Sequence, residues 1–82
     1  MTKNEIVVRR ELTGARETAQ FIQAAMQYRS SLCITYRSYQ ANPKSMMGML
    51  CLGLRPGMRI TISGEGEDEN TAVDHLGKYL SE

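Results

Sequence analysis

The feature that most constrains this chain is its hydrophobic spacing, which switches between a period of two and a period of three to four. Met58, Ile60 and Ile62 alternate with polar residues, the pattern of a half-buried strand. Between Ala15 and Tyr28, apolar residues recur every three or four positions, as on one face of an amphipathic helix. Because such segments alternate within only 82 residues, we expect one small domain, residues 1–82, that mixes helices with strands.

Applied along the whole chain, these periods predict four strands and three helices. The strands are expected over residues 5–10, 32–37, 38–42 and 58–63. The helices are expected over residues 15–28, between Ser45 and Gly53, and from a capping Asp68 to Leu80. The order β-α-β-β-α-β-α indicates an α+β open-faced sandwich, in which a four-stranded, mostly antiparallel sheet carries its helices on one face. A ferredoxin-like split βαβ unit fits the first six elements nearly as well.

Charge and composition argue against several classes of protein. Ten Lys and Arg against nine Asp and Glu give a formal net charge of +1, which provides no strong field for direct binding to nucleic acid or to a membrane. No apolar stretch approaches the roughly 20 residues of a membrane span, so we expect a cytoplasmic protein. Cys33 and Cys51 are too few and too far apart for a CxxC pair or a zinc site, and we expect no metal and no cofactor.

The single histidine argues against an enzyme. A Ser or Cys nucleophile normally needs a base, and the only imidazole, His75, falls on the last predicted helix directly before Leu76. The glycines match neither a phosphate-binding P-loop nor a dinucleotide-binding turn. We therefore expect a protein that binds partners and catalyses no reaction.

One candidate site is the glycine break before the first helix, Gly14-Ala15-Arg16. A helix N-terminus offers free backbone N–H donors, and the guanidinium of Arg16 adds a positive charge beside them. These three residues are therefore predicted to form a pocket for phosphate or another anion, or for a carboxylate of a partner.

A second candidate site is Ser45 with the methionines that follow it. If Ser45 caps a short helix, a phosphate added to its hydroxyl would face the positive end of the helix dipole. So short a helix cannot bury Met46, Met47 and Met49 together with its leucines in one thin core. We expect a partner-binding surface formed by Arg16 and these methionines, with Met46 or Met47 the residue that faces the partner.

Several blocks of this sequence resemble the HPr family, the histidine phosphocarrier proteins of the bacterial phosphoenolpyruvate-dependent sugar phosphotransferase system. The blocks are Ala15-Arg16, Ala19-Gln20-Phe21-Ile22, Lys44-Ser45-Met46-Met47-Gly48, Leu52-Gly53-Leu54, Ile60-Thr61-Ile62-Ser63 and Gly66-Glu67-Asp68-Glu69. They run in the same order as in the family over nearly the whole chain. The resemblance implies the family's open-faced β-sandwich of four antiparallel strands covered by three helices.

The family's phosphoacceptor motif, G-[LI]-H-[AT]-R-P-A, is matched only in part. Placing Ala15-Arg16 on its [AT]-R pair puts Gly14 at the histidine and Glu17 at the proline. The resemblance therefore implies that the arginine which steadies the phosphorylated imidazole is kept while the imidazole itself is lost. A threonine hydroxyl cannot replace it, because a phosphate ester is too stable to pass the group onward.

The regulatory part of the family pattern is present. Ser45 matches the serine that HPr kinase/phosphorylase modifies with ATP, and Met46 and Met47 match the hydrophobic patch around it. A branch of the family, the catabolite-repression HPr called Crh, also lacks the histidine, has glutamine in its place, and acts with the transcription regulator CcpA. The resemblance implies a Crh-like regulatory protein with these two kinds of partner. Alternatives are a small anion- or protein-binding module that uses Gly14 to Arg16, and a phosphocarrier copy that has lost its activity.

Overall fold

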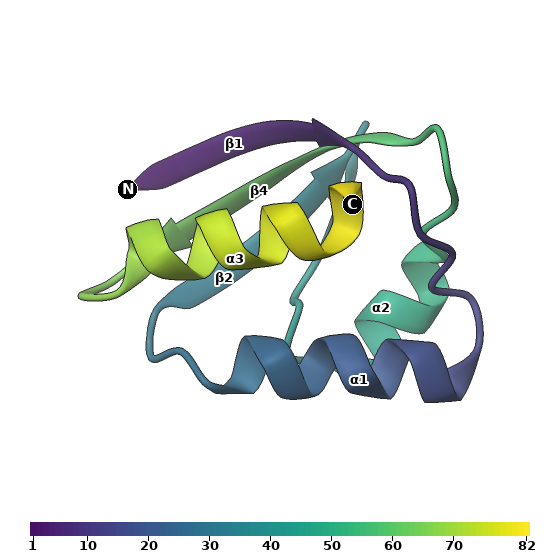
Figure 1. The fold of residues 1–82 in the computed structure, drawn as a ribbon, viewed down its shortest axis with the longest axis horizontal. Helices are drawn as coiled ribbons and strands as arrows, with labels where there is room; N and C mark the ends of the chain where they lie inside the picture. The colour runs from purple at the N-terminus through teal and green to yellow at the C-terminus, as the bar shows by residue number, and fades with distance from the viewer.

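Four antiparallel strands form one sheet in the computed structural model, which describes residues 1–82. The strands are β1 (Thr2–Val7), β2 (Ser31–Tyr36), β3 (Tyr39–Ala41) and β4 (Arg59–Glu65). The helices are α1 (Ala15–Met26), α2 (Met46–Leu52) and α3 (Glu69–Ser81). The predicted order β-α-β-β-α-β-α is confirmed, and the helices lie on one face of the sheet (Figure 1).

The order of strands in the sheet decides between the two architectures that the sequence pattern left open. The strands lie in the order β1-β4-β2-β3, and each neighbouring pair is antiparallel. The second and fourth strands are therefore central, whereas a ferredoxin-like sheet has its first and third strands in the centre. The fold is the open-faced β-sandwich.

Alternation along the central strands determines which face of the sheet is buried. Ile34 of β2 lies opposite Ile62 of β4, and both are fully buried beneath the helices. The neighbouring pair, Thr35 and Thr61, points to the other face, which no helix covers. Sixteen buried residues form the core: Val8, Leu12, Phe21, Ala24, Ala25, Leu32, Ile34, Ala41, Met49, Leu54, Ile60, Ile62, Ala72, Val73, Leu76 and Leu80.

The predicted bounds are wrong at the edge strand β1. This strand begins at Thr2 and ends at Val7 rather than spanning residues 5–10, because β4 continues to Glu65 and offers Gly64 as the partner of Thr2. β4 also extends two residues beyond its predicted end at residue 63. Gly64 lies where α3 crosses the sheet, and a Cβ there would come within 3.0 Å of side chains of Leu32 and Val73.

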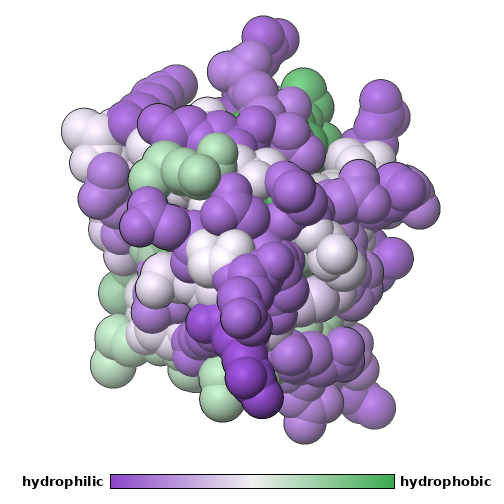
Figure 2. Space-filling model, turned by 90° about the vertical axis from the view of Figure 1, so that its left-hand side faces the viewer, coloured by the Kyte–Doolittle hydropathy of each residue, from purple (hydrophilic) through white to green (hydrophobic).

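The two ends of the molecule differ in what they expose. The N-terminal end of α1 and the whole of α2 lie at one end, and α3 begins at the other (Figure 1). A view onto the end where α3 begins shows mostly hydrophilic side chains with scattered apolar ones (Figure 2). No helix here has both the length and the apolar character that crossing a membrane requires.

Candidate functional site

The N-terminus of α1 is capped by a glycine and lacks a side-chain cap. Gly14 has φ −95° and ψ 156°, and the first backbone bond of the helix joins the Thr18 N–H to the Gly14 carbonyl at 3.1 Å. Ala15 and Arg16 are exposed, and Gly14 is half-buried. The three residues therefore stand where the sequence places them, at the start of a helix with free N–H groups.

The carboxylate of Glu17 lies over this helix start. A Cβ built on Gly14 would be 2.5 Å from Oε1 of Glu17, so the carboxylate occupies the space that a side chain at position 14 would need. An incoming phosphate would be repelled by this charge unless the Glu17 side chain turned away. The hydroxyl of Thr18, fully buried one residue further on, has no hydrogen-bond partner.

The only histidine lies far from the start of α1. His75 Nδ1 is 2.5 Å from the hydroxyl of Tyr28, which follows the C-terminal end of α1, and the two rings pack edge to face with centroids 5.7 Å apart. The 12 residues of α1 separate Gly14 from this pair, a distance of about 18 Å along the helix axis. His75 is therefore part of the packing between α1 and α3.

Ser45 begins α2 in the manner that the sequence predicts. Its backbone is extended, with φ −110° and ψ 118°, and its Oγ accepts a hydrogen bond from the Gly48 N–H at 3.3 Å. The helix ends at Gly53, whose φ of 61° is the left-handed conformation typical of a helix stop. Because the Ser45 side chain is only half-buried, a modifying group can reach it from solvent.

Lys44, directly before Ser45, is already engaged in hydrogen bonds. Its Nζ donates to the carbonyl oxygens of Tyr28 at 2.7 Å and of Ser30 at 3.0 Å. The lysine thus ties α2 to the end of α1, where backbone carbonyls lack helical partners. Its ammonium therefore already has two hydrogen-bond partners within the fold.

The three methionines of α2 separate into two groups. Met47 is 73% exposed and Met46 is 38% exposed, as expected for residues that face a partner. The prediction for Met49 is wrong, because this side chain is fully buried in the core. Met49 lies one helical turn after Ser45, on the side of α2 that packs inward, so no partner can reach it.

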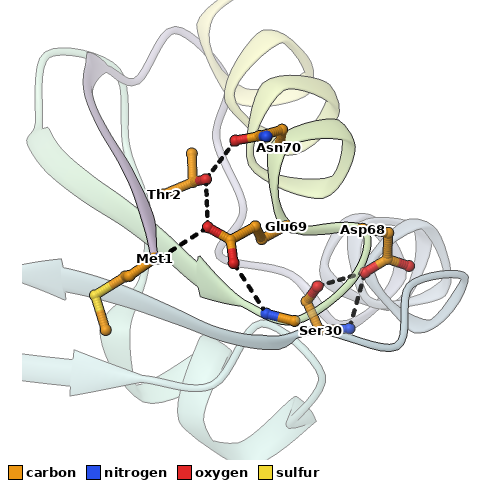
Figure 3. A network of polar contacts seen from close by, with 7 residues as sticks. Met1, Thr2, Ser30, Asp68, Glu69 and Asn70 are labelled. Atoms are coloured by element: carbon orange, nitrogen blue, oxygen red, sulfur yellow. Dashed lines mark hydrogen bonds and ion pairs between the residues drawn. The ribbon is translucent and has the colours of Figure 1, made fainter.

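A network of hydrogen-bonded carboxylates that the sequence pattern does not predict lies at the start of α3 (Figure 3). Asp68 is the N-cap residue of α3, as predicted, but its side chain makes no hydrogen bond to the helix. Its carboxylate instead accepts hydrogen bonds from the Ser30 hydroxyl, from the Arg29 N–H at 2.9 Å and from the Ser30 N–H at 3.0 Å. The bond from the Ser30 hydroxyl, followed by that from the Arg29 N–H, lowers the pKa of Asp68.

Glu69 occupies a comparable position in the first turn of α3. Its carboxylate accepts from the Thr2 hydroxyl at 2.7 Å and from the Gly66 N–H at 3.2 Å, and it pairs with the amino group of Met1 at 3.1 Å. These contacts, the Thr2 bond foremost, lower the pKa of Glu69 from 4.5 to about 2. The network joins β1, the start of β2 and α3, and we interpret it as structural.

The two cysteines lie apart and neither forms a disulfide. Cys33 is half-buried on β2, and Cys51 is exposed on α2 rather than packed in the core. No group of three or more His, Cys, Asp or Glu side chains gathers closely enough to hold a metal ion.

Fold and site together define a class: a small open-faced β-sandwich with two helix N-termini at one end, one capped by a serine and the other beginning at a glycine beside a carboxylate. Comparison with known families agrees with this class. The family model described as PTS HPr component phosphorylation site matches residues 2–82. The chain belongs to the HPr family of the phosphotransferase system, as its sequence blocks suggested.

The similar proteins include both phosphocarrier HPr proteins and an HPr-like protein named Crh. The chain is 40% identical over 67 residues to the phosphocarrier protein HPr of Buchnera aphidicola from Acyrthosiphon pisum, covering 82% of this chain and 79% of that protein. It is 33% identical over 84 residues to the HPr-like protein Crh of Bacillus subtilis, covering 100% and 98%. Among solved structures, HPr from Bacillus anthracis superposes with a TM-score of 0.90 at 30% identity, covering 98% and 96%.

Proposed function

We propose that this chain is an HPr-like regulatory protein that is switched by phosphorylation of Ser45 and does not relay phosphate through a histidine. The observation that carries the proposal is the contrast between two helix N-termini. α2 begins with a capping serine beside two exposed methionines. α1 begins with Gly14 beneath the carboxylate of Glu17.

The loss of the carrier step follows from chemistry at position 14. A phosphocarrier needs a ring nitrogen that forms a labile P–N bond, and glycine offers no side chain at all. His75 cannot substitute, since it lies at the other end of α1 in contact with Tyr28. Thr18 is buried, and a hydroxyl would in any case give an ester too stable to transfer.

Phosphorylation of Ser45 needs only a kinase and ATP. The Ser45 Oγ would bond to the γ-phosphorus of ATP and lose its proton while ADP leaves. The new phosphate would stand at the positive end of α2, near the N–H of Gly48 that already donates to the Ser45 Oγ. Because Lys44 is bonded to backbone carbonyls, most of the added charge would be left for cationic groups of a partner.

The surface around Ser45 supports this role. Met47 and Met46 are exposed beside it, and flexible thioether side chains adapt to more than one partner. Arg16 is exposed at the same end of the molecule. We propose HPr kinase/phosphorylase and a CcpA-like regulator as the partners that use this surface, in the cytoplasm, with the chain acting as a binding protein and not as an enzyme.

Two incubations test the proposal. With enzyme I and phosphoenolpyruvate, the chain should gain no acid-labile phosphoryl group under conditions that load an ordinary HPr. With HPr kinase and ATP it should gain one acid-stable phosphate, and Ser45→Ala should gain none. A stoichiometric acid-labile adduct would overturn the loss of the carrier step. An unmodified Ser45 would instead identify a phosphocarrier copy that has lost its activity.

A further inference from the structure

The largest hollow on the surface is a groove that the proposed function does not use. It has a volume of about 1060 Å³ and lies between the β2–β3 turn, the C-terminal half of α2 and the loop before β4. Half-buried apolar side chains of Tyr36, Leu52 and Met58 line part of it. Thr13 lies at its border, so the groove is next to the start of α1 without including Gly14.

Three arginines line this groove, one in the β2–β3 turn and two in the segment that runs from α2 into β4. Arg37 belongs to the β2–β3 turn, Arg55 to the loop after α2, and Arg59 to the first position of β4. None of the 12 lining residues is acidic, and neither of the two ion pairs in the structure involves these arginines. The lining itself therefore supplies no negative charge to these guanidinium groups; Glu11, just outside it, accepts a hydrogen bond from the Thr13 hydroxyl at 2.9 Å. A bound anion would supply the missing counter-charge. The near-zero net charge of the chain conceals this local excess.

The backbone that carries these arginines is held in place. Arg37 is the only residue other than glycine with a positive φ, 56°, a conformation that glycine or asparagine adopts at lower cost. Its guanidinium lies 5.1 Å from the centre of the Tyr36 ring, a cation–π contact that orients it. Arg55 begins a turn through Pro56 and Gly57 that is closed by a bond from the Met58 N–H to the Arg55 carbonyl at 3.2 Å.

We infer that this groove binds a small molecule that carries at least two phosphate groups. Guanidinium groups bind phosphate oxygens through paired hydrogen bonds, and a groove lined by three of them, from two separate segments, has donors for more than one phosphate. The apolar lining suits a compact organic body between the phosphates, as in most ligand sites. The inference does not depend on Ser45, which does not line the groove. It also does not depend on whether Gly14 stands at the position of the family's histidine.

Titration of the ¹⁵N-labelled chain with pyrophosphate tests the inference. We expect saturable shifts of the backbone amides of Arg37, Arg55 and Arg59, with an affinity that falls as salt is added. Arg55→Gln and Arg59→Gln should each weaken binding by about tenfold, as the loss of hydrogen bonds to a charged ligand predicts. Arg59→Lys should fall between, because lysine keeps the charge but not the paired donors.

A matched control is Arg29→Gln, which removes the same charge from an exposed arginine in the α1–β2 connection, away from the groove. It should change the affinity by less than about twofold. The inference is overturned if no saturable shift occurs, if shifts are confined to Ala15 and Arg16, or if the control weakens binding as much as the groove variants. It is also overturned if hexaglutamate binds more tightly with the same dependence on Arg55 and Arg59, which would make the groove a surface for an acidic protein segment.

Discussion

The starts of α1 and α2 lie at the same end of the molecule and differ in the side chain of the N-cap residue. Both present free N–H groups and the positive end of a helix dipole. Ser45 adds an oxygen that caps its helix and can accept a phosphoryl group. Gly14 adds nothing, and Glu17 already places a negative charge there. A helix N-terminus is therefore not a phosphate site by geometry alone, because the side chains at its first four positions decide what it can hold.

The start of α3 extends the comparison. There the anions are the chain's own, since Glu69 bonds to the Gly66 N–H and Asp68 bonds across to Ser30. These contacts fasten the loop before α3 to the rest of the fold. Of the three helix starts, only that of α2 has a side-chain hydroxyl that caps the helix, and this residue remains partly accessible.

The largest expected effect comes from rebuilding the start of α1. Gly14→His alone should accept phosphate from enzyme I poorly, because its side chain would meet the Glu17 carboxylate and the phosphorylated ring would sit beside that charge. Adding Glu17→Pro should raise transfer by about tenfold or more, the effect of removing a like charge from a phosphoryl site. Proline costs no hydrogen bond here, since the helical bonds begin with Thr18.

Phosphoryl transfer from radiolabelled phosphoenolpyruvate measures this restoration, with Glu17→Pro alone as the control that should stay inactive. Near-normal transfer by Gly14→His alone would show that the altered flank is harmless and that the histidine is the only difference that matters.

A second prediction separates the buried and exposed methionines of α2. Met49→Ala should destabilise the fold by about 2–5 kcal/mol because it empties a fully buried site. Met47→Ala should change the free energy of unfolding by less than about 0.5 kcal/mol, since its side chain is exposed. Urea unfolding of both variants measures the difference. Equal losses would contradict the assignment of Met47 to a binding surface.

A third prediction concerns the cap of α2. Ser45→Ala should lower the free energy of unfolding by about 1 kcal/mol, because the Gly48 N–H loses its acceptor. Ser45→Asp should keep most of the stability, since aspartate is also a good cap and its charge suits the helix dipole. If alanine were as stable as serine in urea unfolding, the hydrogen bond to Gly48 would have no energetic role.

The smallest expected effect is a loss of stability in acid that arises at the start of α3. The pKa of Glu69 is about 2 in the fold against an ordinary 4.5, so its contribution is complete above pH 4.5 and is lost as the pH falls toward 2. Asp68, whose pKa is also lowered, adds to the loss in the same direction. Both side chains are partly exposed, so solvent screening keeps the effect modest. Urea midpoints across this range should decline less for Glu69→Gln than for the unaltered chain.

The sequence predicts an element correctly where its ends are determined by residues that are neighbours in the chain. Ser45 and Gly53 bound α2 as expected because a cap and a left-handed glycine act over one helical turn. The ends of β1 were wrong because an edge strand extends as far as its neighbour pairs with it, and β4 is more than 50 residues away in the chain.

Contacts between residues far apart in the chain also explain why the Asp68 network and the groove lined by arginines could not be predicted from the sequence. The Asp68 carboxylate bonds to Ser30 rather than to an N–H of its own helix, and nothing near Asp68 in the sequence marks Ser30 as its partner. The arginine groove brings together three segments whose arginines are each unremarkable alone. Met49 was misplaced because a short run of apolar residues does not reveal which one faces the core.

We propose that phosphate at Ser45 changes the affinity of this chain for its partners. Calorimetric titration of a CcpA-like regulator with the chain, before and after phosphorylation by HPr kinase, tests it most directly. We expect at least tenfold tighter binding of the phosphorylated form, and a loss of that gain in Ser45→Ala treated in the same way. Equal affinity of the two forms would contradict it.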